Sequence, residues 1–401
     1  MPKSFWSFGS PGQLVFGRKS VNQLSKLATR FNWQRALIIT DGNLLDAGVV
    51  TPVQQALVAG GARVEVFSDG EPEPSIAIAE ASLKCANDFA PDVIVGVGGG
   101  SNLDLSKSTA AAFTHNGHPA EYFGFDKVPG PTLPLVCIPT TAGTGSEVSH
   151  SMVLTDTDQK IKISGQSDYF RPDWAIVDPE LTYSCPRQVA ADSGIDALTH
   201  AIEAMTTVDF DKLEVPAGET CAYEGRNVLT SALAERAIRI CGRYLEPAVL
   251  EPANYEAKDQ MALAATLAGM AFSNSGVALV HALEYPMGGE LHCSHGLGNG
   301  LLLPYVMNFN LEARRQTFAE IAGWLAPEAE HPERVEAEDA VKAIERLRES
   351  IGIPHRIRDI GGKEEQLHSF TEKAMKIQRL FWLNPRSASY DDIYQIYHAA
   401  F

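Results

Sequence analysis

Up to about residue 185, short apolar runs alternate along the chain with amphipathic stretches of helical period. The apolar runs are RALIITDG at 35–42, ARVEVFSDG at 62–70 and PDVIVGVGGG at 91–100, and the stretches between them are LLDAGVVTPVQQALVAGG at 44–61 and IAIAEASLKCANDFA at 76–90. Continuous apolar runs separated by helices are typical of parallel strands that are covered on both faces. This half of the sequence therefore predicts an open α/β sheet.

After Pro186 the strand pattern fades, and long Ala- and Leu-rich helical patterns follow. They are DALTHAIEAM at 196–205, NVLTSALAERAIRICGRYL at 227–245, KDQMALAATLAGMAF at 258–272, RRQTFAEIAGWL at 314–325 and EDAVKAIERLRESIG at 338–352. Acidic residues near several starts and basic residues near several ends suit the helix dipole. We expect an α/β domain at 1–187 and an all-helical domain at 188–401.

One polar, acidic and turn-rich segment, 208–227, separates two of the helical patterns. Segments of this length are usually functional lids or disordered connections, and the sequence leaves both open. If it lines a substrate entrance, Glu214 and Glu219 would favour a cationic or neutral substrate.

The net charge bears on the possible binding partners of the protein, and the cysteine content bears on its cellular compartment. The 401 residues carry 33 basic and 50 acidic side chains, for a formal net charge of −17. Such a surface repels phosphate backbones and anionic lipids, so we expect neither nucleic acid nor membrane partners. The six cysteines are scattered, and no stretch has the length of an apolar leader or membrane span. We expect reduced thiols and a cytoplasmic protein.

Two small-residue clusters follow predicted strands. Gly96, Gly98, Gly99 and Gly100 lie at the end of the run at 91–100, directly before a helical stretch. Thr140, Thr141, Thr144 and Ser146 follow the run LPLVCIP. Glycines there let a pyrophosphate approach the backbone and a helix N-terminus, and hydroxyls add donors. Plain turns have the same composition, and the glycines do not form a spaced GxGxxG.

An acidic residue, Asp41, ends the first apolar run. A carboxylate in this position can accept from a ribose 2′-OH and repel a 2′-phosphate. The ordinary alternative is a helix cap.

Candidate metal ligands occur in the helical half. Asp196 and His200 are spaced i,i+4 in DALTHAIEA and so project from one helix face, while His281 and His295 bracket HALEYPMGGELHCSHG. One carboxylate and three imidazoles form a donor set for divalent iron or zinc. Taken singly, such residues are more often surface pairs or core histidines.

The sequence resembles the iron-containing (group III) alcohol dehydrogenases nearly from end to end. The motifs that carry the resemblance are Phe16-Gly17, TDG at 40–42, GGGSNLDLSK, PTTAGTGSEV, DPELT from Asp178, DALTHAIEA, the His281 to His295 segment with its trailing HGLGNGLLLPYV, and NPR at 384–386.

The resemblance implies a Rossmann-like dinucleotide-binding domain, an all-helical domain, and a metal and substrate in the cleft between them. It places the metal, usually Fe(II) with Zn(II) also suited, on Asp196, His200, His281 and His295, with His281 counted among the catalytic residues. It places cofactor contacts on Asp41, Gly98, Gly99, Gly100, Ser101, Asp104, Thr140, Thr141, Thr144, Ser146 and Lys162. The implied reaction is hydride transfer between a small alcohol and NAD, which Asp41 favours over NADP, in a homodimer or larger homo-oligomer.

The sequence departs from the family's HxxxHP stretch, because Tyr285 stands where many members have a second histidine. Tyr285 is a candidate proton relay, although its ordinary pKa of about 10 makes it a weak base, and it could equally be a pocket wall. A tyrosine before proline is also similar to the hydroxyacid-oxoacid transhydrogenase branch, which keeps 2-hydroxy acids among the candidate substrates.

Two other functions compete with this one. A lyase or cyclase resembling 3-dehydroquinate synthase would need a Glu-led metal set and several basic residues, which the candidate site lacks. A protein that kept the fold for binding alone is the third hypothesis.

Four further residues could reach a pocket. We expect His150 and Phe272 to flank the predicted cleft. We expect Met152 to be a core residue and His292 to be a solvated loop residue.

Overall fold

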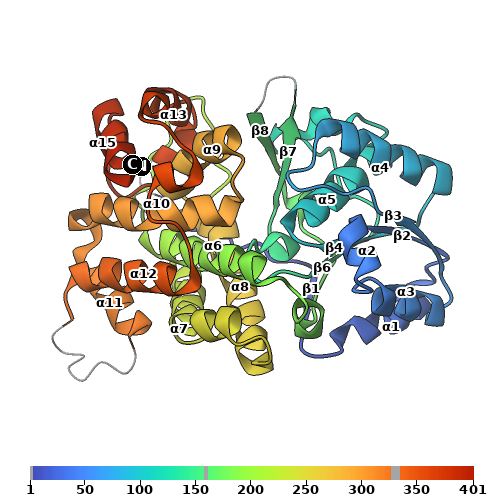
Figure 1. Cartoon of the computed structure of the whole chain (residues 1–401). Coiled ribbons are helices and arrows are strands. Elements are labelled where there is room, and N and C mark those ends of the chain that lie inside the picture. Colours follow the sequence, from blue (N-terminus) through green and yellow to red (C-terminus); the bar gives the residue numbers. More distant parts are fainter. Residues whose placement is uncertain (1–2, 158–160, 327–334) are drawn as a thin grey trace. The chain divides into compact units, whose positions relative to one another are not determined.

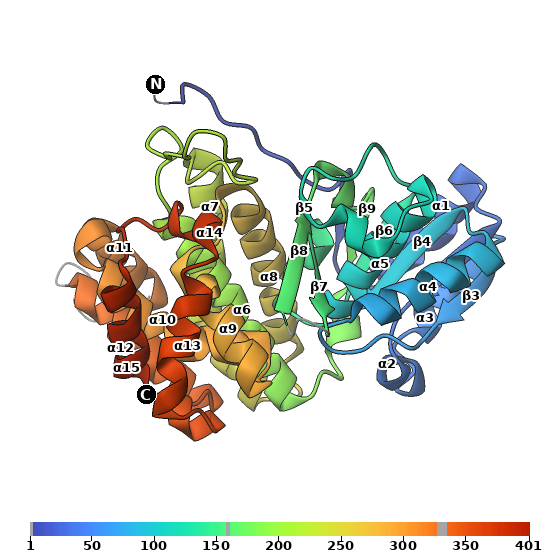
Figure 2. The ribbon, with the colours of Figure 1, turned by 90° about the horizontal axis from the view of Figure 1, so that it is seen from above.

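The computed structural model describes residues 3–157, 161–326 and 335–401. They form two compact units. We call Gly9–Ser184 the sheet unit, and Cys185–Phe401 together with Met1–Phe8 the helical unit (Figures 1 and 2). Each unit is described by itself.

The sheet unit is built on a parallel sheet of six strands, in the order β1-β9-β6-β4-β2-β3. The strands are β1 (Gln13–Phe16), β2 (Arg35–Ile39), β3 (Arg63–Phe67), β4 (Val93–Gly98), β6 (Leu135–Pro139) and β9 (Trp174–Val177). This confirms the predicted parallel sheet. The chain reverses its direction across the sheet between β2 and β4, and open α/β sheets bind ligands at the carboxyl ends of the strands beside such a reversal.

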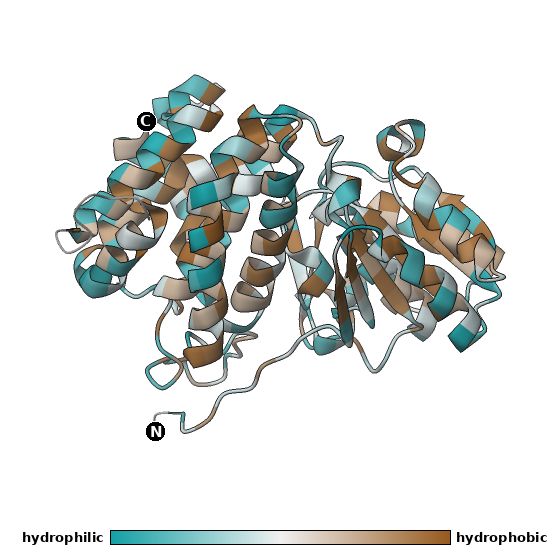
Figure 3. Cartoon of the chain, turned by 90° about the horizontal axis from the view of Figure 1, so that it is seen from below, coloured by the Kyte–Doolittle hydropathy of each residue, from teal (hydrophilic) through white to brown (hydrophobic). Residues whose placement is uncertain are grey.

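Helices cover both faces of this sheet, as the continuous apolar runs predict. Alternate residues of β2 point to opposite faces, so Ile38 packs with α1 and α3 in one core, and Ile39 packs with α4 and α5 in the other. The helices of the sheet unit are α1 (Gln23–Phe31), α2 (Gly42–Asp46), α3 (Thr51–Ala59), α4 (Ile76–Phe89) and α5 (Gly100–His115). Figure 3 shows the hydrophobic colour concentrated on the strands and alternating with polar residues along the helices.

A second, three-stranded sheet was not predicted. Its order is β5-β8-β7, from the strands β5 (Gly124–Phe125), β7 (Ser151–Asp156) and β8 (Ile161–Gln166). β7 and β8 pair antiparallel, and β5 pairs parallel with β8. Only short polar-apolar alternation marks these strands in the sequence, which is a weak signal beside the long apolar runs.

The helical unit confirms the predicted helical C-terminal part. Its helices are α6 (Arg187–Thr206), α7 (Val228–Leu250), α8 (Tyr255–Ser275), α9 (Leu279–Leu291), α10 (His295–Asn310), α11 (Arg315–Leu325), α12 (Ala337–Ile351), α13 (Leu367–Ala374), α14 (Gln378–Phe381) and α15 (Tyr390–Ala400). In the described part of the chain, no single helix is long and apolar enough to cross a membrane. The consecutive pair α8 and α9 passes by length and composition only, with a 105° bend between them.

The acidic segment 208–227 is closed at its base. Asp209 pairs with Arg226 across an isolated bridge, and it also pairs with Arg314, whose guanidinium donates to the Thr206 carbonyl at the end of α6. The two arginines outweigh the effect of burial and hold the pKa of Asp209 below its ordinary value. Both ends of the segment are therefore tied to α6, whereas its action as a lid stays a prediction.

Candidate metal centre and nucleotide loops

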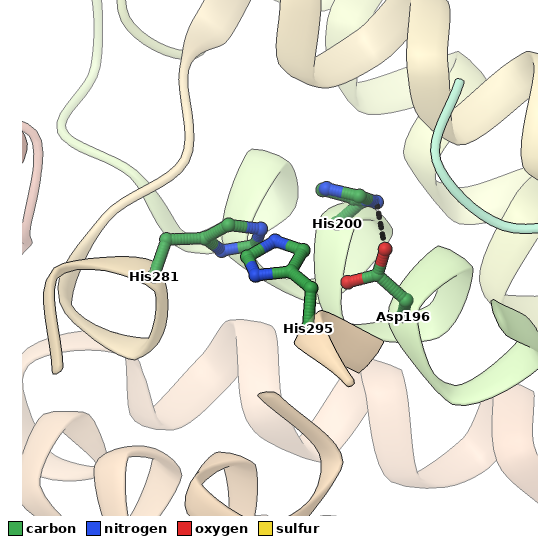
Figure 4. A group of neighbouring side chains, drawn as sticks. All are labelled: Asp196, His200, His281 and His295. Carbon is green, nitrogen blue, oxygen red and sulfur yellow. Dashed lines mark ion pairs between the residues drawn. The ribbon is translucent and has the colours of Figure 1, made fainter. Parts of the chain in front are cut away.

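Three helices of the helical unit bring the four predicted metal ligands together (Figure 4). Asp196 and His200 lie one turn apart on α6, His281 lies on α9, and His295 is the first residue of α10. One ligand atom from each residue lies within 4.8 Å of the corresponding atoms of the other three. The first three side chains are buried, and His295 is partly exposed.

The HGLGNG sequence of α10 allows this close approach. A Cβ atom on Gly296 would lie 2.0 Å from the Asp192 carbonyl oxygen of α6, and one on Gly298 would lie 2.8 Å from Cγ of Glu284 on α9. Real Cβ atoms do not approach other atoms so closely. Glycine on both sides of α10 therefore lets the helix lie against α6 and α9 at once, with His295 beside Asp196.

Two buried glutamates orient two of the imidazoles. Nδ1 of His281 lies 2.6 Å from Oε2 of Glu203, and Nδ1 of His295 lies 2.5 Å from Oε2 of Glu284. Glu203 also accepts from the Val280 N–H at 2.7 Å. Because a carboxylate can only accept, Nδ1 carries the proton in each ring and Nε2 presents its lone pair. Metal-binding histidines characteristically have such a carboxylate behind them.

A buried amide shows where the lone pairs converge. Nδ2 of Asn299 lies 2.8 Å from Oδ1 of Asp196, 3.2 Å from Nε2 of His281 and 3.1 Å from Nε2 of His295. Three acceptors thus point toward one small region, as they would toward a cation. Burial alone would raise the pKa of Asp196, but His200, His295 and His281 hold it below its ordinary value.

Helices α9 and α10, which carry His281 and His295, each contain a proline. Pro286 lies inside α9 and Pro304 inside α10, and a proline both removes one intrahelical N–H and pushes the preceding turn apart. In both helices the carbonyl three residues before the proline receives a hydrogen bond from a buried side chain. Tyr397 Oη donates to the Leu283 carbonyl at 2.6 Å, and Arg348 Nη1 donates to the Leu301 carbonyl at 2.9 Å.

These donors come from the last part of the chain, α15 and α12. Burial raises the pKa of Tyr397 well above its ordinary value, so its phenol keeps the proton that it donates. The C-terminal helices therefore help to hold α9 and α10, and with them the imidazoles, in place.

Replacing Tyr397 by phenylalanine is expected to lower the free energy of unfolding by about 1–3 kcal/mol, the usual cost of a buried group that loses its partner. With Pro286→Ala in the same chain, the loss should be smaller. The alanine N–H can bond to the Ala282 carbonyl and straighten the helix, which lets the Met287 N–H reach the Leu283 carbonyl. Urea unfolding of the two single variants and the double variant measures both values. Equal losses in the two backgrounds would contradict this account of the helix bend.

The predicted cofactor residues gather in the sheet unit, at the carboxyl ends of β2, β4 and β6. Ile39 is paired in register with Gly96, and Gly98 with Pro139, so the segments that follow the three strands share one edge. A Cβ atom on Gly100 would lie 2.9 Å from Cγ2 of Thr144, which shows that the two small-residue loops touch.

Several predicted contact residues hold this edge together through their side chains. Asp104 accepts from the Ser146 hydroxyl at 2.6 Å and from the Val153 N–H at 3.0 Å. Ser101 Oγ accepts from the Glu73 N–H, and Glu73 forms an ion pair with Lys162 at 2.6 Å. Whether these residues also touch a nucleotide stays a prediction.

Asp41 and Lys107 complete this edge. Asp41 is the N-cap of α2, which is the helix-cap alternative considered from the sequence. Its contact with a ribose stays a prediction. Lys107, which was not predicted, is buried and donates to Ser146 Oγ at 3.0 Å and to the Ser151 carbonyl at 2.7 Å. Burial lowers its pKa. The sequence signal that could have identified Lys107 is its position as a single lysine before the Ala-rich part of α5.

Comparisons with known proteins decide the family. A sequence profile described as iron-containing alcohol dehydrogenase matches residues 11–179, and the profile of the C-terminal part of the Fe-containing alcohol dehydrogenase family matches residues 217–401. The long-chain-alcohol dehydrogenase 1 of Geobacillus thermodenitrificans is 38% identical to this chain, over 96% of this chain and 94% of its own length. The chain belongs to the iron-containing alcohol dehydrogenase family.

Solved structures agree with this assignment. The structure of a 1,3-propanediol oxidoreductase superposes on this chain with a TM-score of 0.90 and 34% sequence identity. The match covers 99% of this chain and 100% of the oxidoreductase chain. That of the sulfoacetaldehyde reductase from Bifidobacterium kashiwanohense, in complex with NAD+, has a TM-score of 0.85 and 28% identity, with 99% of both chains covered. The present enzyme is therefore a metal-dependent alcohol oxidoreductase of the iron-containing type.

The four-residue cluster of this alcohol dehydrogenase fits a divalent ion. Metal–nitrogen and metal–oxygen distances of about 2.1 Å place two donors at most about 4.2 Å apart across one ion. A donor pair at the upper limit of 4.8 Å would therefore have to approach by at least about 0.6 Å, and by about 1.4 Å for a tetrahedral ion, whose donors lie about 3.4 Å apart. One carboxylate and three imidazoles suit iron and zinc.

The remaining pocket candidates separate into two groups. In the helical unit, Phe272 stacks on His200 with ring centroids 4.3 Å apart, and the Tyr285 ring lies 5.9 Å from that of His295. His292 is an exposed residue that ends α9. In the sheet unit, Met152 is buried in the core formed with α4 and α5, and His150 is buried after the Thr-rich loop.

Proposed function

We propose that this enzyme interconverts a small alcohol and its aldehyde or ketone with NAD(H), and that Asp196, His200, His281 and His295 hold its metal ion. The observation that carries the proposal is the convergence of four ligand atoms, with a glutamate behind two of the imidazoles. The Asn299 amide has only two protons for the three acceptors that face it, so a purely structural cluster would leave one lone pair unmatched.

The chemistry divides between the ion and the side chains around it. When bound, a divalent ion acts as a Lewis acid, which lowers the pKa of an alcohol and polarises a carbonyl group. Asp196 supplies the only negative charge among the four ligands, so the centre keeps a net positive charge. Glu203 and Glu284 hold the Nδ1 protons and thereby fix the rings, while the buried ring of Phe272 shields the face of His200 from water.

Tyr285 is proposed as the group that passes a proton between the alcohol and solvent. Its partly exposed ring lies 5.9 Å from that of His295, the most accessible ligand. A pocket wall, with protons leaving through water, is the alternative, and the pH profile of a Tyr285→Phe variant separates the two.

Cofactor binding is assigned to residues 1–187, and metal binding and catalysis to residues 188–401. The pyrophosphate would lie on Gly98, Gly99 and Gly100 with the Thr-rich loop beside them, at the reversal point of the sheet. Asp41 favours NAD over NADP, and the solved NAD+ complex of a sulfoacetaldehyde reductase with 28% identity supports a nicotinamide cofactor.

The proposal also covers the identity of the metal ion, the oligomeric state of the enzyme and its cellular compartment. Fe(II) is the expected ion, and Zn(II) suits the same donors. We propose a homodimer or larger homo-oligomer in the cytoplasm, without nucleic acid or membrane partners. The net charge of −17 and the six cysteines, none of them in a disulfide, support the location and the lack of such partners.

An activity screen tests the proposed function. Protein loaded with Fe(II) under anaerobic conditions, and in parallel with Zn(II), is incubated with NAD+ and short alcohols, diols, amino alcohols and 2-hydroxy acids. We expect NADH from at least one alcohol or diol. Exchange of hydride between a hydroxy acid and an oxo acid without free NADH would instead indicate a transhydrogenase. Turnover of a sugar phosphate without net NADH would indicate a lyase or cyclase, and no turnover at all would leave only a binding role.

A further inference from the structure

One buried amide joins three strand ends at the nucleotide edge of the sheet unit. Asn102 lies in the first turn of α5, two residues after Gly100, and its side chain is 3% exposed. A Cβ atom on Gly98, the last residue of β4, would lie 2.2 Å from Asn102 Nδ2, and one on Gly70, after β3, would lie 2.3 Å from Asn102 Oδ1. The backbone on both sides thus encloses the amide and fixes its position.

The amide is hydrogen-bonded to Asp41, which lies two residues after the end of β2. Asn102 Nδ2 donates to Oδ2 of Asp41 at 2.7 Å, while Oδ1 of Asp41 accepts from the Leu44 N–H at 3.1 Å. One donor on each oxygen holds the carboxylate in a single orientation. A carboxylate has about four lone-pair positions, so acceptor capacity remains for a further hydroxyl group.

We propose that Asn102 determines the selectivity between the two nicotinamide cofactors, by positioning the Asp41 carboxylate. The proposal rests on the assignment of NAD to this edge. In its fixed orientation Asp41 accepts from a ribose 2′-OH and opposes a 2′-phosphate. Without the amide, the carboxylate keeps only its bond to Leu44 N–H and can rotate away, which weakens both effects.

The role is one of positioning, because the side-chain hydrogen bond of Asn102 goes to the Asp41 carboxylate. Its loss should raise the dissociation constant for NADH about tenfold, as expected when a hydrogen bond to a charged group is lost, and should leave that for NADPH unchanged or lowered. The ratio of the two constants is therefore the diagnostic quantity. A purely structural loss would weaken both cofactors by the same factor.

Fluorescence titration of the full-length enzyme with NADH and with NADPH tests this. The variants are Asn102→Ala, with Asn102→Ser as a milder change if the alanine variant does not fold, and Asn87→Ala on the exposed side of α4 as a matched control. The same alanine change is also made together with Asp41→Ala. We expect the ratio to shift about tenfold toward NADPH in the wild-type background and to stay constant once Asp41 is absent.

Two results would overturn the inference. A wild-type enzyme that prefers NADH, with an unchanged ratio in the Asn102 variants, would contradict the role of Asn102 and leave the proposed function intact. A wild-type enzyme that binds neither nucleotide would contradict both.

Discussion

Replacement of His281 by alanine is expected to remove the bound metal ion and the alcohol dehydrogenase activity together. The change takes away one of three imidazoles, and it leaves Oε2 of the buried Glu203 without the donor that lies 2.6 Å away. Since a Lewis-acid ion supplies several kcal/mol of transition-state stabilisation, kcat should fall by about a thousandfold or more.

The measurement combines metal analysis by mass spectrometry with NADH formation on one alcohol. His398→Ala, an exposed histidine on α15, is the matched control and should keep both metal and activity. Circular dichroism shows whether the His281 variant is folded. A folded His281→Ala enzyme that lacks metal and retains full activity would remove the metal centre from the mechanism.

Replacement of Glu203 or Glu284 by glutamine is expected to weaken metal binding about 10- to 100-fold, the usual effect of losing the group behind a metal-binding histidine. A glutamine oxygen can still accept the Nδ1 proton, but the negative charge that makes the ring a stronger donor is lost. The metal ion should then dissociate more readily, while the fold changes little.

Competition with a chelator gives the dissociation constants for Zn(II) and Co(II). Glu290→Gln serves as the control, because Glu290 lies on the same helix as Glu284 and pairs instead with Lys373 and Ser369. Equal affinities in the Glu203, Glu284 and Glu290 variants would show that the two glutamates serve packing alone.

The fold was accessible from the sequence because its signals are local. Apolar runs such as 36–40 and 93–98, separated by helical stretches, are typical of buried parallel strands, and the structure has them as β2 and β4. The hairpin of β7 and β8 was missed, because its short alternating strands carry little apolar signal. The sequence also could not predict the reversal of strand order between β2 and β4, because the order depends on which strands pair in three dimensions.

The candidate site shows a similar division. The spacing of Asp196 and His200 places them on one helix face, and the family resemblance supplies His281 and His295. The supporting residues could not be found in this way. Glu203 is hydrogen-bonded to a histidine 78 positions away, and Glu284 to His295 rather than to His281, its neighbour on α9. Such pairs depend on how α6, α9 and α10 pack against one another.

Metal reconstitution tests the central claim most directly. Enzyme stripped with a chelator is titrated anaerobically with Fe(II), and the rate of NADH formation is plotted against the measured metal content per chain. The account predicts almost no activity without metal and a linear rise that ends at about one ion per chain, the capacity of a single four-ligand site. Full activity in the stripped enzyme would contradict it.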